Sequence, residues 1–369
     1  MNTTRRGFLA ATASTVAAPY IMGANSKSGA GLPIIGEGKY KYEVTHDWGE
    51  LPSEISYGNC HGVVEDAQGH IYIHHTVNKN SKSDDAMVVF DSKGKFVRSF
   101  FKEFKGGAHG LHIRKEGSQE FLYMCDTKRG IVAKTDLKGE KVWEIGYPDE
   151  SPEYQKKDKD GKNIKYTPTN LAVAPNGDIY VGDGYGSSFI NQYTKDAKFI
   201  RTFGGGKGKE PGQLNSPHGI IIDERGKTPM VCVADRSNNR IQYFTLDGKH
   251  SHFVGNTNAP CHFSIRKGKM LIPDLAARIT LFDEKNQLLA HLGDGGPSAR
   301  ALRTKSRDNF IAGQFVCPHG GIIDYLLINV TGLPTFYNHK KRDRHRFWAF
   351  LGRFFYHSIF KKNTINDAA

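Results

Sequence analysis

The sequence predicts an all-β protein built as a six-bladed β-propeller. Runs of four to six β-branched and aromatic residues, bounded by Gly, Pro, Asn or Asp, are typical of strands in antiparallel meanders. The 41 glycines among 369 residues suit a fold with many tight turns. Groups of these runs recur about every 45 to 60 residues, which is the period of propeller blades. We therefore expect one four-stranded sheet per repeat.

The clearest repeat lies between residues 211 and 254. Its apolar runs occupy residues 219–223, 230–235 and 240–244, and a fourth run, 250–254, follows the Asp247-Gly248 turn. The same pattern begins near residues 59, 107, 168, 260 and 317. A charged stretch, 149–163, interrupts the spacing and is expected to be an exposed loop.

The sixth repeat begins like the others but loses its pattern after Asp324. The sixth blade is therefore expected to be incomplete or divergent. This would leave a gap between the fifth and first blades. An N-terminal strand near residues 39–45 could help to close it.

One position of the repeat carries imidazoles in five of the six units. Just before each expected first strand stand His61, His109, Asn170, His218, His262 and His319. The first strand of a blade is innermost, so these residues are expected to line the central channel. Blades two, four and six all supply a histidine, whereas blade three supplies an asparagine. Three imidazoles that leave a fourth position open form the ligand set of a catalytic zinc site. The sequence thus favours His109, His218 and His319 as metal ligands, although Pro-His-Gly is also an ordinary strand-entry turn.

Several motifs carry a resemblance to a known family. The stretch 235–244, DRSNNRIQYF, is close to the NHL-repeat signature. Within NHL propellers the chain resembles the peptidyl-α-hydroxyglycine α-amidating lyases, on motifs at 108–111, 168–173, 182–185, 211–218 and 317–319. The resemblance implies zinc-dependent cleavage of a C–N bond, giving a peptide amide and glyoxylate. It also implies zinc at His109, His218 and His319, and a catalytic role for Tyr185, which could otherwise simply pack beside Gly184.

The chain departs from that family at two positions. Thr76 stands where the family has a catalytic arginine, and His74, His75 or Lys79 would have to supply the positive charge. Gly320 stands where the family has an aspartate that helps to hold a structural calcium, so calcium is doubtful here. The resemblance therefore supports the metal site better than it supports the residues that would hold the substrate.

Other functions stay open at this point. The protein could be a zinc lyase acting on a small-molecule or peptide substrate at the channel mouth. It could also be a non-catalytic NHL propeller that binds a protein or glycan there. A calcium-dependent lactonase-like propeller ranks last, because its channel would carry carboxylates. The formal net charge of +13 lies largely in the two ends of the chain, so we expect no nucleic-acid binding.

The N-terminus, residues 1–30, resembles a twin-arginine export signal with a short linker. Arg5 and Arg6 precede an apolar run over residues 10–21, with cleavage expected after Ala24 or Ala30. The protein is therefore expected to be periplasmic or extracellular. Five cysteines would meet an oxidising compartment there. Cys60, Cys261 and Cys317 adjoin the channel positions and are expected to be small buried residues, with a disulfide or a soft metal ligand as alternatives.

The propeller is expected to span residues 31–330, and residues 331–369 form a divergent tail rich in basic and aromatic residues. Apolar residues alternate with Arg346 and Arg353 there, which is typical of a membrane-surface segment; they are Phe347, Phe350, Leu351, Phe354 and Phe355. A frameshift in the gene would also explain the loss of pattern.

Overall fold

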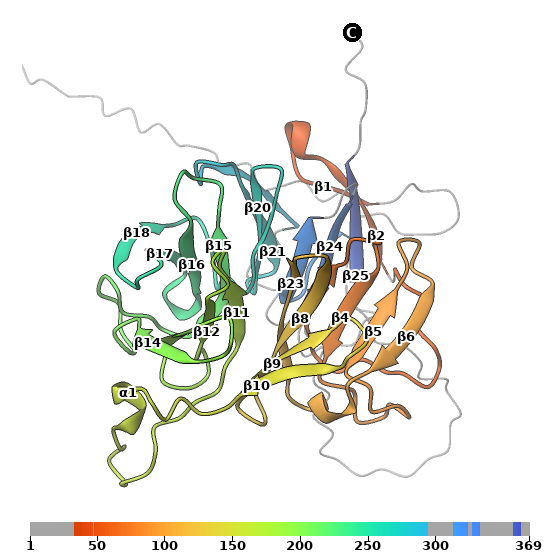
Figure 1. The fold of residues 1–369 in the computed structure, drawn as a ribbon. Coiled ribbons are helices and arrows are strands. Elements are labelled where there is room, and N and C mark those ends of the chain that lie inside the picture. Colours follow the sequence, from red (N-terminus) through yellow and green to blue (C-terminus); the bar gives the residue numbers. More distant parts are fainter. Residues whose placement is uncertain (1–32, 47, 294–312, 324–326, 333–356, 363–369) are drawn as a thin grey trace, which may run out of the picture.

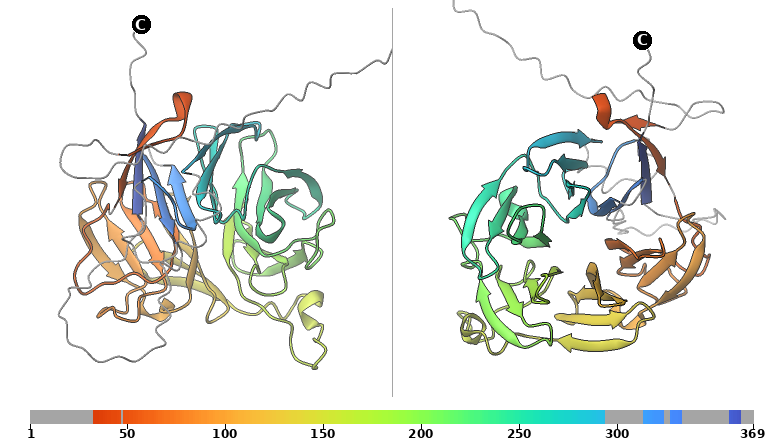
Figure 2. Two further views of the ribbon diagram at one scale, coloured as in Figure 1. Left: turned by 180° about the vertical axis from the view of Figure 1, so that it is seen from behind. Right: turned by 45° about the horizontal axis from the view of Figure 1, so that its top comes forward.

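The computed structural model describes residues 33–46, 48–293, 313–323, 327–332 and 357–362. Antiparallel sheets are arranged in a ring about a central axis (Figure 1 and Figure 2). The predicted signal segment and most of the predicted tail lie outside the described residues. No helix within the described ranges has the length and apolar character needed to span a membrane.

Five blades share one plan, in which four consecutive strands pair antiparallel in sequence order. Blade one has β3 (Cys60–Glu65), β4 (Ile71–His75), β5 (Met87–Phe90) and β6 (Phe96–Phe100), and blade two has β7 (Ala108–Glu116), β8 (Gln119–Asp126), β9 (Ile131–Asp136) and β10 (Lys141–Ile145). Blade three has β11 (Asn170–Val173), β12 (Ile179–Gly182), β13 (Ile190–Tyr193) and β14 (Phe199–Phe203), and blade four has β15 (Pro217–Asp223), β16 (Met230–Asp235), β17 (Arg240–Phe244) and β18 (His250–Val254). Blade five has β19 (Ser264–Arg266), β20 (Lys269–Asp274), β21 (Arg278–Phe282) and β22 (Leu288–Leu292).

The remaining sheet departs from this plan, so the described residues form five regular blades rather than the predicted six, and the sixth repeat, which was expected to be incomplete or divergent, is part of a different sheet. Its order is β1-β2-β25-β24-β23, so it combines strands from both ends of the chain. These strands are β1 (Ile34–Ile35), β2 (Tyr42–His46), β25 (His357–Lys362), β24 (Leu327–Gly332) and β23 (Pro318–Ile323). The innermost strand, β23, lies between β20 of blade five and β3 of blade one. The expectation that an N-terminal strand would help to close the ring is confirmed by the pairing of β2 with β25.

Apolar side chains fill each seam between neighbouring sheets. Tyr123 and Val132 of blade two, for example, pack against Leu171 and Val181 of blade three. Similar clusters join blades one and two, three and four, and four and five. At the closing seam, Val44 of β2 packs in one cluster with residues of blade five. Each sheet thus buries both faces, which is why runs of apolar residues mark the strands.

The seam formed by β2 allows a stability prediction. Val44 is 1% exposed, whereas Val97 on β6 is 42% exposed. Val44→Ala is expected to lower the free energy of unfolding by about 2 kcal/mol, because it removes buried methyl groups and leaves a cavity. Val97→Ala is the matched control and should change it by less than about 0.5 kcal/mol. Urea titrations measure both. Equal effects would show that β2 does not close the ring.

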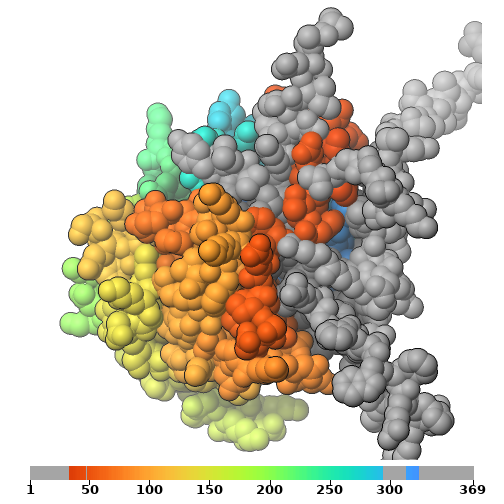
Figure 3. Space-filling model, turned by 90° about the vertical axis from the view of Figure 1, so that its right-hand side faces the viewer, coloured from red at the N-terminus to blue at the C-terminus, as the bar shows by residue number. Residues whose placement is uncertain are grey.

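The insertion between blades two and three is mostly exposed, as predicted, and includes the short helix α1 (Pro152–Gln155). It projects from the body of the ring, at the bottom of the molecule in Figure 3. Tyr154 is its buried anchor, and its hydroxyl donates to Asp183 at 2.7 Å.

Four innermost strands are irregular where they begin. The registers of β3, β7, β15 and β23 shift around His61, His109, His218 and His319, so these histidines leave the hydrogen-bonded ladder. A bulge of this kind redirects a side chain. A Cβ on Gly110 would lie 2.6 Å from the carbonyl oxygen of Thr169, and one on Gly219 would lie 2.7 Å from that of Cys261. Glycine after histidine therefore allows neighbouring innermost strands to approach closely.

Candidate metal centre

The histidines of the four bulged strands meet inside the ring. The ring centroids of His109 and His218 are 4.8 Å apart, those of His218 and His319 are 4.5 Å apart, and those of His109 and His319 are 5.2 Å apart. The structure thus brings together the three residues that the sequence favours as ligands. All of them are buried.

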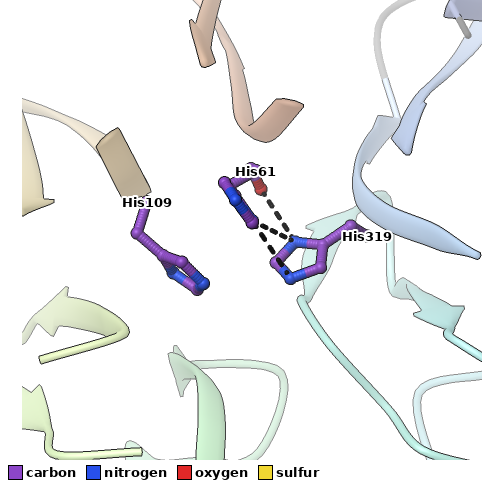
Figure 4. A group of neighbouring side chains, drawn as sticks. All are labelled: His61, His109 and His319. Carbon is purple, nitrogen blue, oxygen red and sulfur yellow. Dashed lines mark hydrogen bonds between the residues drawn. The ribbon is translucent and has the colours of Figure 1, made fainter. Parts of the chain in front are cut away.

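His61 belongs to the same cluster, which the sequence did not predict. Its ring centroid lies 4.2 Å from that of His109 and 4.3 Å from that of His319, and its Nδ1 is 3.2 Å from Nε2 of His319 (Figure 4). The expected division between alternate blades therefore does not hold for blade one. Among the residues that the structure describes, two groups of three have ligand atoms within 4.8 Å of one another: His61, His109 and His319, and His218, Cys261 and His319.

The other two predicted channel residues stand apart from these groups. Asn170 begins β11, and its side-chain oxygen accepts a hydrogen bond from the N–H of Leu171 at 2.8 Å. His262 precedes β19 and is buried, with no hydrogen-bond partner for Nδ1 among the described residues. Neither residue belongs to a ligand group in the described ranges.

Backbone carbonyls orient two of the imidazoles. The Nδ1 of His109 lies 2.6 Å from the oxygen of Thr169, and the Nδ1 of His218 lies 2.7 Å from that of Cys261. Since a carbonyl oxygen only accepts, each Nδ1 carries the proton and each Nε2 presents a lone pair. Ligand histidines in metal sites are usually held in this way.

Burial keeps the cluster neutral. It lowers the pKa of His109 to about 3 and, with the nearby positive charges, lowers the pKa of His61, His218 and His319 well below the usual range. Neutral imidazoles are the form that binds zinc. The donor set of these groups therefore suits a metal ion that prefers nitrogen ligands, although the ligand atoms of His109, His218 and His319 do not form one of the two groups by themselves.

Tyr185 lies against the same two imidazoles. Its hydroxyl oxygen is 3.0 Å from Nε2 of His218 and 3.2 Å from Nε2 of His109. The turn that carries it is held by the buried carboxylate of Asp183, which accepts from the N–H groups of Thr167 and Ser187 at 2.6 Å each. The phenol therefore occupies a defined place between two lone pairs.

Arg236 is a site residue that sequence reasoning missed. Its Nη1 donates to the Tyr185 oxygen at 3.2 Å, its Nη2 donates to Oγ of Ser216 at 3.0 Å, and its guanidinium lies 5.1 Å from the centre of the Tyr185 ring. It lies inside the repeat signature 235–244, which we used only to identify the repeat. The cluster thus has a guanidinium from blade four.

Position 76 and its neighbours serve the fold. Thr76 Oγ1 accepts from the N–H of Asn59 at 2.8 Å, and Nδ1 of His75 accepts from that of Val77 at 3.1 Å. Burial lowers the pKa of His74 to about 4, so this side chain is neutral near pH 7. His74 does not supply the positive charge that the sequence assigned to it as one option.

Buried histidines make stability depend on pH. The pKa values of His74 and His112 are lowered by burial to about 4 in the folded protein, against about 6.5 in an unfolded chain. Stability is therefore full above pH 6.5 and falls as the pH drops toward 4, by up to about 1.4 kcal/mol per pH unit for each group. His74→Phe should reduce the slope of unfolding free energy against pH in metal-free protein. An unchanged slope would contradict the assignment.

The cysteine beside the cluster is a buried thiol. Sγ of Cys261 donates to the oxygen of Ala259 at 3.6 Å, as Sγ of Cys60 does to that of Gly58 at 4.0 Å. Neither residue forms a disulfide. Burial raises the pKa of Cys261 to about 12, although the nearby Arg236 guanidinium lowers it.

Comparisons with known proteins find amidating enzymes and an NHL-repeat protein among the similar sequences. The chain is 41% identical over 174 residues to a mouse peptidyl-glycine α-amidating monooxygenase, covering 46% of this chain and 16% of that protein. It is 28% identical over 179 residues to a probable peptidyl-α-hydroxyglycine α-amidating lyase of Caenorhabditis elegans, covering 47% of each. It is also 27% identical over 216 residues to human NHL repeat-containing protein 3, covering 57% of this chain and 58% of that one. No family model matches the chain.

Solved structures support the fold. A streptogramin B lyase superposes with a TM-score of 0.55 at 14% identity, over 89% of this chain and 100% of that one. A gluconolactonase of Xanthomonas campestris gives 0.55 at 13% identity, over 94% and 99%. At these identities the likeness concerns the fold alone. The chain is a β-propeller similar to NHL-repeat and amidating-lyase proteins. It spans less than a fifth of the amidating monooxygenases and less than two thirds of the other two relatives.

Proposed function

We propose that this protein is a zinc-dependent lyase that cleaves peptides ending in α-hydroxyglycine into a peptide amide and glyoxylate. One observation carries the proposal: the Tyr185 hydroxyl lies within 3.2 Å of the Nε2 atoms of two neutral, buried histidines and receives a hydrogen bond from Arg236. The similarity to amidating enzymes supports the same reaction class. In this proposal the sheet that contains β23 acts as the sixth blade of an NHL propeller.

The zinc ion would be held by His109, His218 and His319, with His61 adjacent. When bound, zinc supplies a Lewis acid that lowers the pKa of a hydroxyl group in the site toward neutrality. The carbonyl partners of His109 and His218 keep their Nε2 lone pairs directed into the site. A structural calcium is not part of the proposal, because Gly320 has no side-chain oxygen to offer.

Tyr185 would move the proton. Its phenolate takes the proton from the α-hydroxyl of the substrate, the carbon–oxygen double bond of glyoxylate forms, and the C–N bond breaks. The electron pair of that bond goes to nitrogen, which takes a proton from Tyr185 and leaves as the amide. Arg236 stabilises the phenolate, because its guanidinium donates to the same oxygen.

Location and outer contacts are further parts of the proposal. We propose export by the twin-arginine pathway to the periplasm or the exterior, on the evidence of Arg5, Arg6 and the apolar run after them. The basic and aromatic part of the tail that precedes β25 would then contact a membrane surface. A peptide substrate would enter at the channel mouth beside Tyr185.

Glyoxylate release tests the proposed function directly. Purified protein with a short peptide ending in α-hydroxyglycine is expected to release glyoxylate and the matching amide. Removing zinc with a chelator should abolish release, and zinc, but not magnesium, should restore it, because imidazole ligands favour zinc. If zinc-loaded protein releases no glyoxylate above the buffer rate, the protein is better described as a propeller that binds a protein or glycan.

A further inference from the structure

Cys261 lies closer to the candidate metal centre than its place in the repeat would suggest. Its sulfur falls within 4.8 Å of ligand atoms of both His218 and His319, and all three residues are buried. Its own carbonyl oxygen accepts the hydrogen bond that orients His218. Cys261 therefore adjoins His218 through both its backbone and its side chain.

Cys60 provides an internal comparison. It precedes His61 as Cys261 precedes His262, it is also buried, and its thiol likewise points to the carbonyl two residues earlier. Within the described ranges, however, Cys60 belongs to neither group of ligand atoms. The proximity of Cys261 to the cluster is thus a property of blade five and does not follow from the repeat.

The charge of the site makes a thiolate favourable there. Four neutral imidazoles would hold a divalent cation beside the Arg236 guanidinium, which is itself close to the sulfur of Cys261. The two ligand groups of the described residues contain no carboxylate. Buried positive charges of this kind are costly unless an anion compensates them. A thiolate is the one anionic ligand that these groups can provide.

We propose that the sulfur of Cys261 is itself a metal ligand, acting with His218 and His319, so that the resting centre holds zinc through sulfur and nitrogen. As the sulfur–metal bond forms, the thiol proton leaves to solvent and the site loses one unit of positive charge. A thiolate also selects zinc against calcium and magnesium, which prefer oxygen ligands. This inference rests on the metal binding in the proposed function and is independent of the lyase reaction.

Cobalt substitution tests the inference without any activity assay. Protein loaded with Co²⁺ in place of zinc is expected to show a thiolate-to-cobalt charge-transfer band in the near ultraviolet. Cys261→Ala should lose this band and bind zinc more than about 100-fold more weakly, since a ligand matters more than its supporting partners. Cys60→Ala is the matched control and should keep both the band and the affinity.

Each outcome decides something different. If wild-type protein binds cobalt but shows no such band, Cys261 is not a ligand and the three-histidine centre of the proposed function stands. If wild-type protein binds neither cobalt nor zinc, both proposals fail. If Cys261→Ala does not fold, Cys261→Ser and the wild-type spectrum still give the answer. A band that survives in folded Cys261→Ala or Cys261→Ser overturns the inference.

Discussion

Tyr185→Phe is expected to lower kcat for glyoxylate release by about 10²- to 10⁴-fold, the usual contribution of a positioned acid or base. The substitution removes one oxygen, which lies 3.0 Å from Nε2 of His218 and accepts a hydrogen bond from Arg236. The ring and its surroundings remain. Zinc content should stay at the wild-type level, because the imidazole and thiol groups that could hold the ion are unchanged.

A second tyrosine serves as the matched control for this prediction. Tyr147 lies just before the insertion between blades two and three, and its hydroxyl is 3.0 Å from each of the backbone oxygens of Tyr154 and Ile164, so it can donate to either. Tyr147→Phe should leave kcat within about twofold of wild type. If Tyr185→Phe retains full kcat with normal zinc, the phenol is a packing residue and another group moves the proton.

His218→Ala is expected to remove zinc and lyase activity together. His218 is shared by the predicted zinc triad and by the group that includes Cys261, and its Nε2 lone pair is held in place by the carbonyl of Cys261. Loss of this ligand should weaken zinc binding by more than about 100-fold, which exceeds the usual effect of a supporting partner. Elemental analysis after gel filtration, with glyoxylate release measured on the same sample, checks both effects.

His252→Ala is the corresponding control. His252 lies on β18 of the same blade and stacks on Tyr243 at a centroid distance of 4.5 Å, away from the ring axis. It should retain full zinc and activity. If His218→Ala folds normally and still binds one zinc ion per chain, His218 is not a required ligand and the group of His61, His109 and His319 is the better description of the metal site.

Local patterns were enough to predict most of the propeller. Apolar runs and glycine turns recur within each blade because every sheet buries both faces. Each short segment therefore carries the sequence pattern that predicts its own strand or turn. The closing sheet could be predicted only in part: an N-terminal strand was expected in it, but the partner of that strand was not. It pairs β2 with β25, and such pairing between distant strands depends on how the whole ring returns to its beginning.

The candidate site was predictable to the extent that it follows the repeat. His109, His218 and His319 share one repeat position, and the structure brings them together. His61 joined them because β3 bulges as β7 and β15 do, and a bulge depends on contacts between blades. Arg236 was missed because its side chain reaches Tyr185 across a blade boundary, a contact that no sequence spacing reveals.

The late position of β23 in the chain affects the order in which the metal ligands come together during synthesis. His319 lies on that strand, and the sheet that holds it also contains β25, which follows β23 and β24 in the chain. While the chain is still emerging from the ribosome, His109 and His218 can already be in place, but the last imidazole arrives only when the ring closes. Capture of the metal is therefore expected to be a late event and to slow unfolding, because the ring must reopen before the ion can leave.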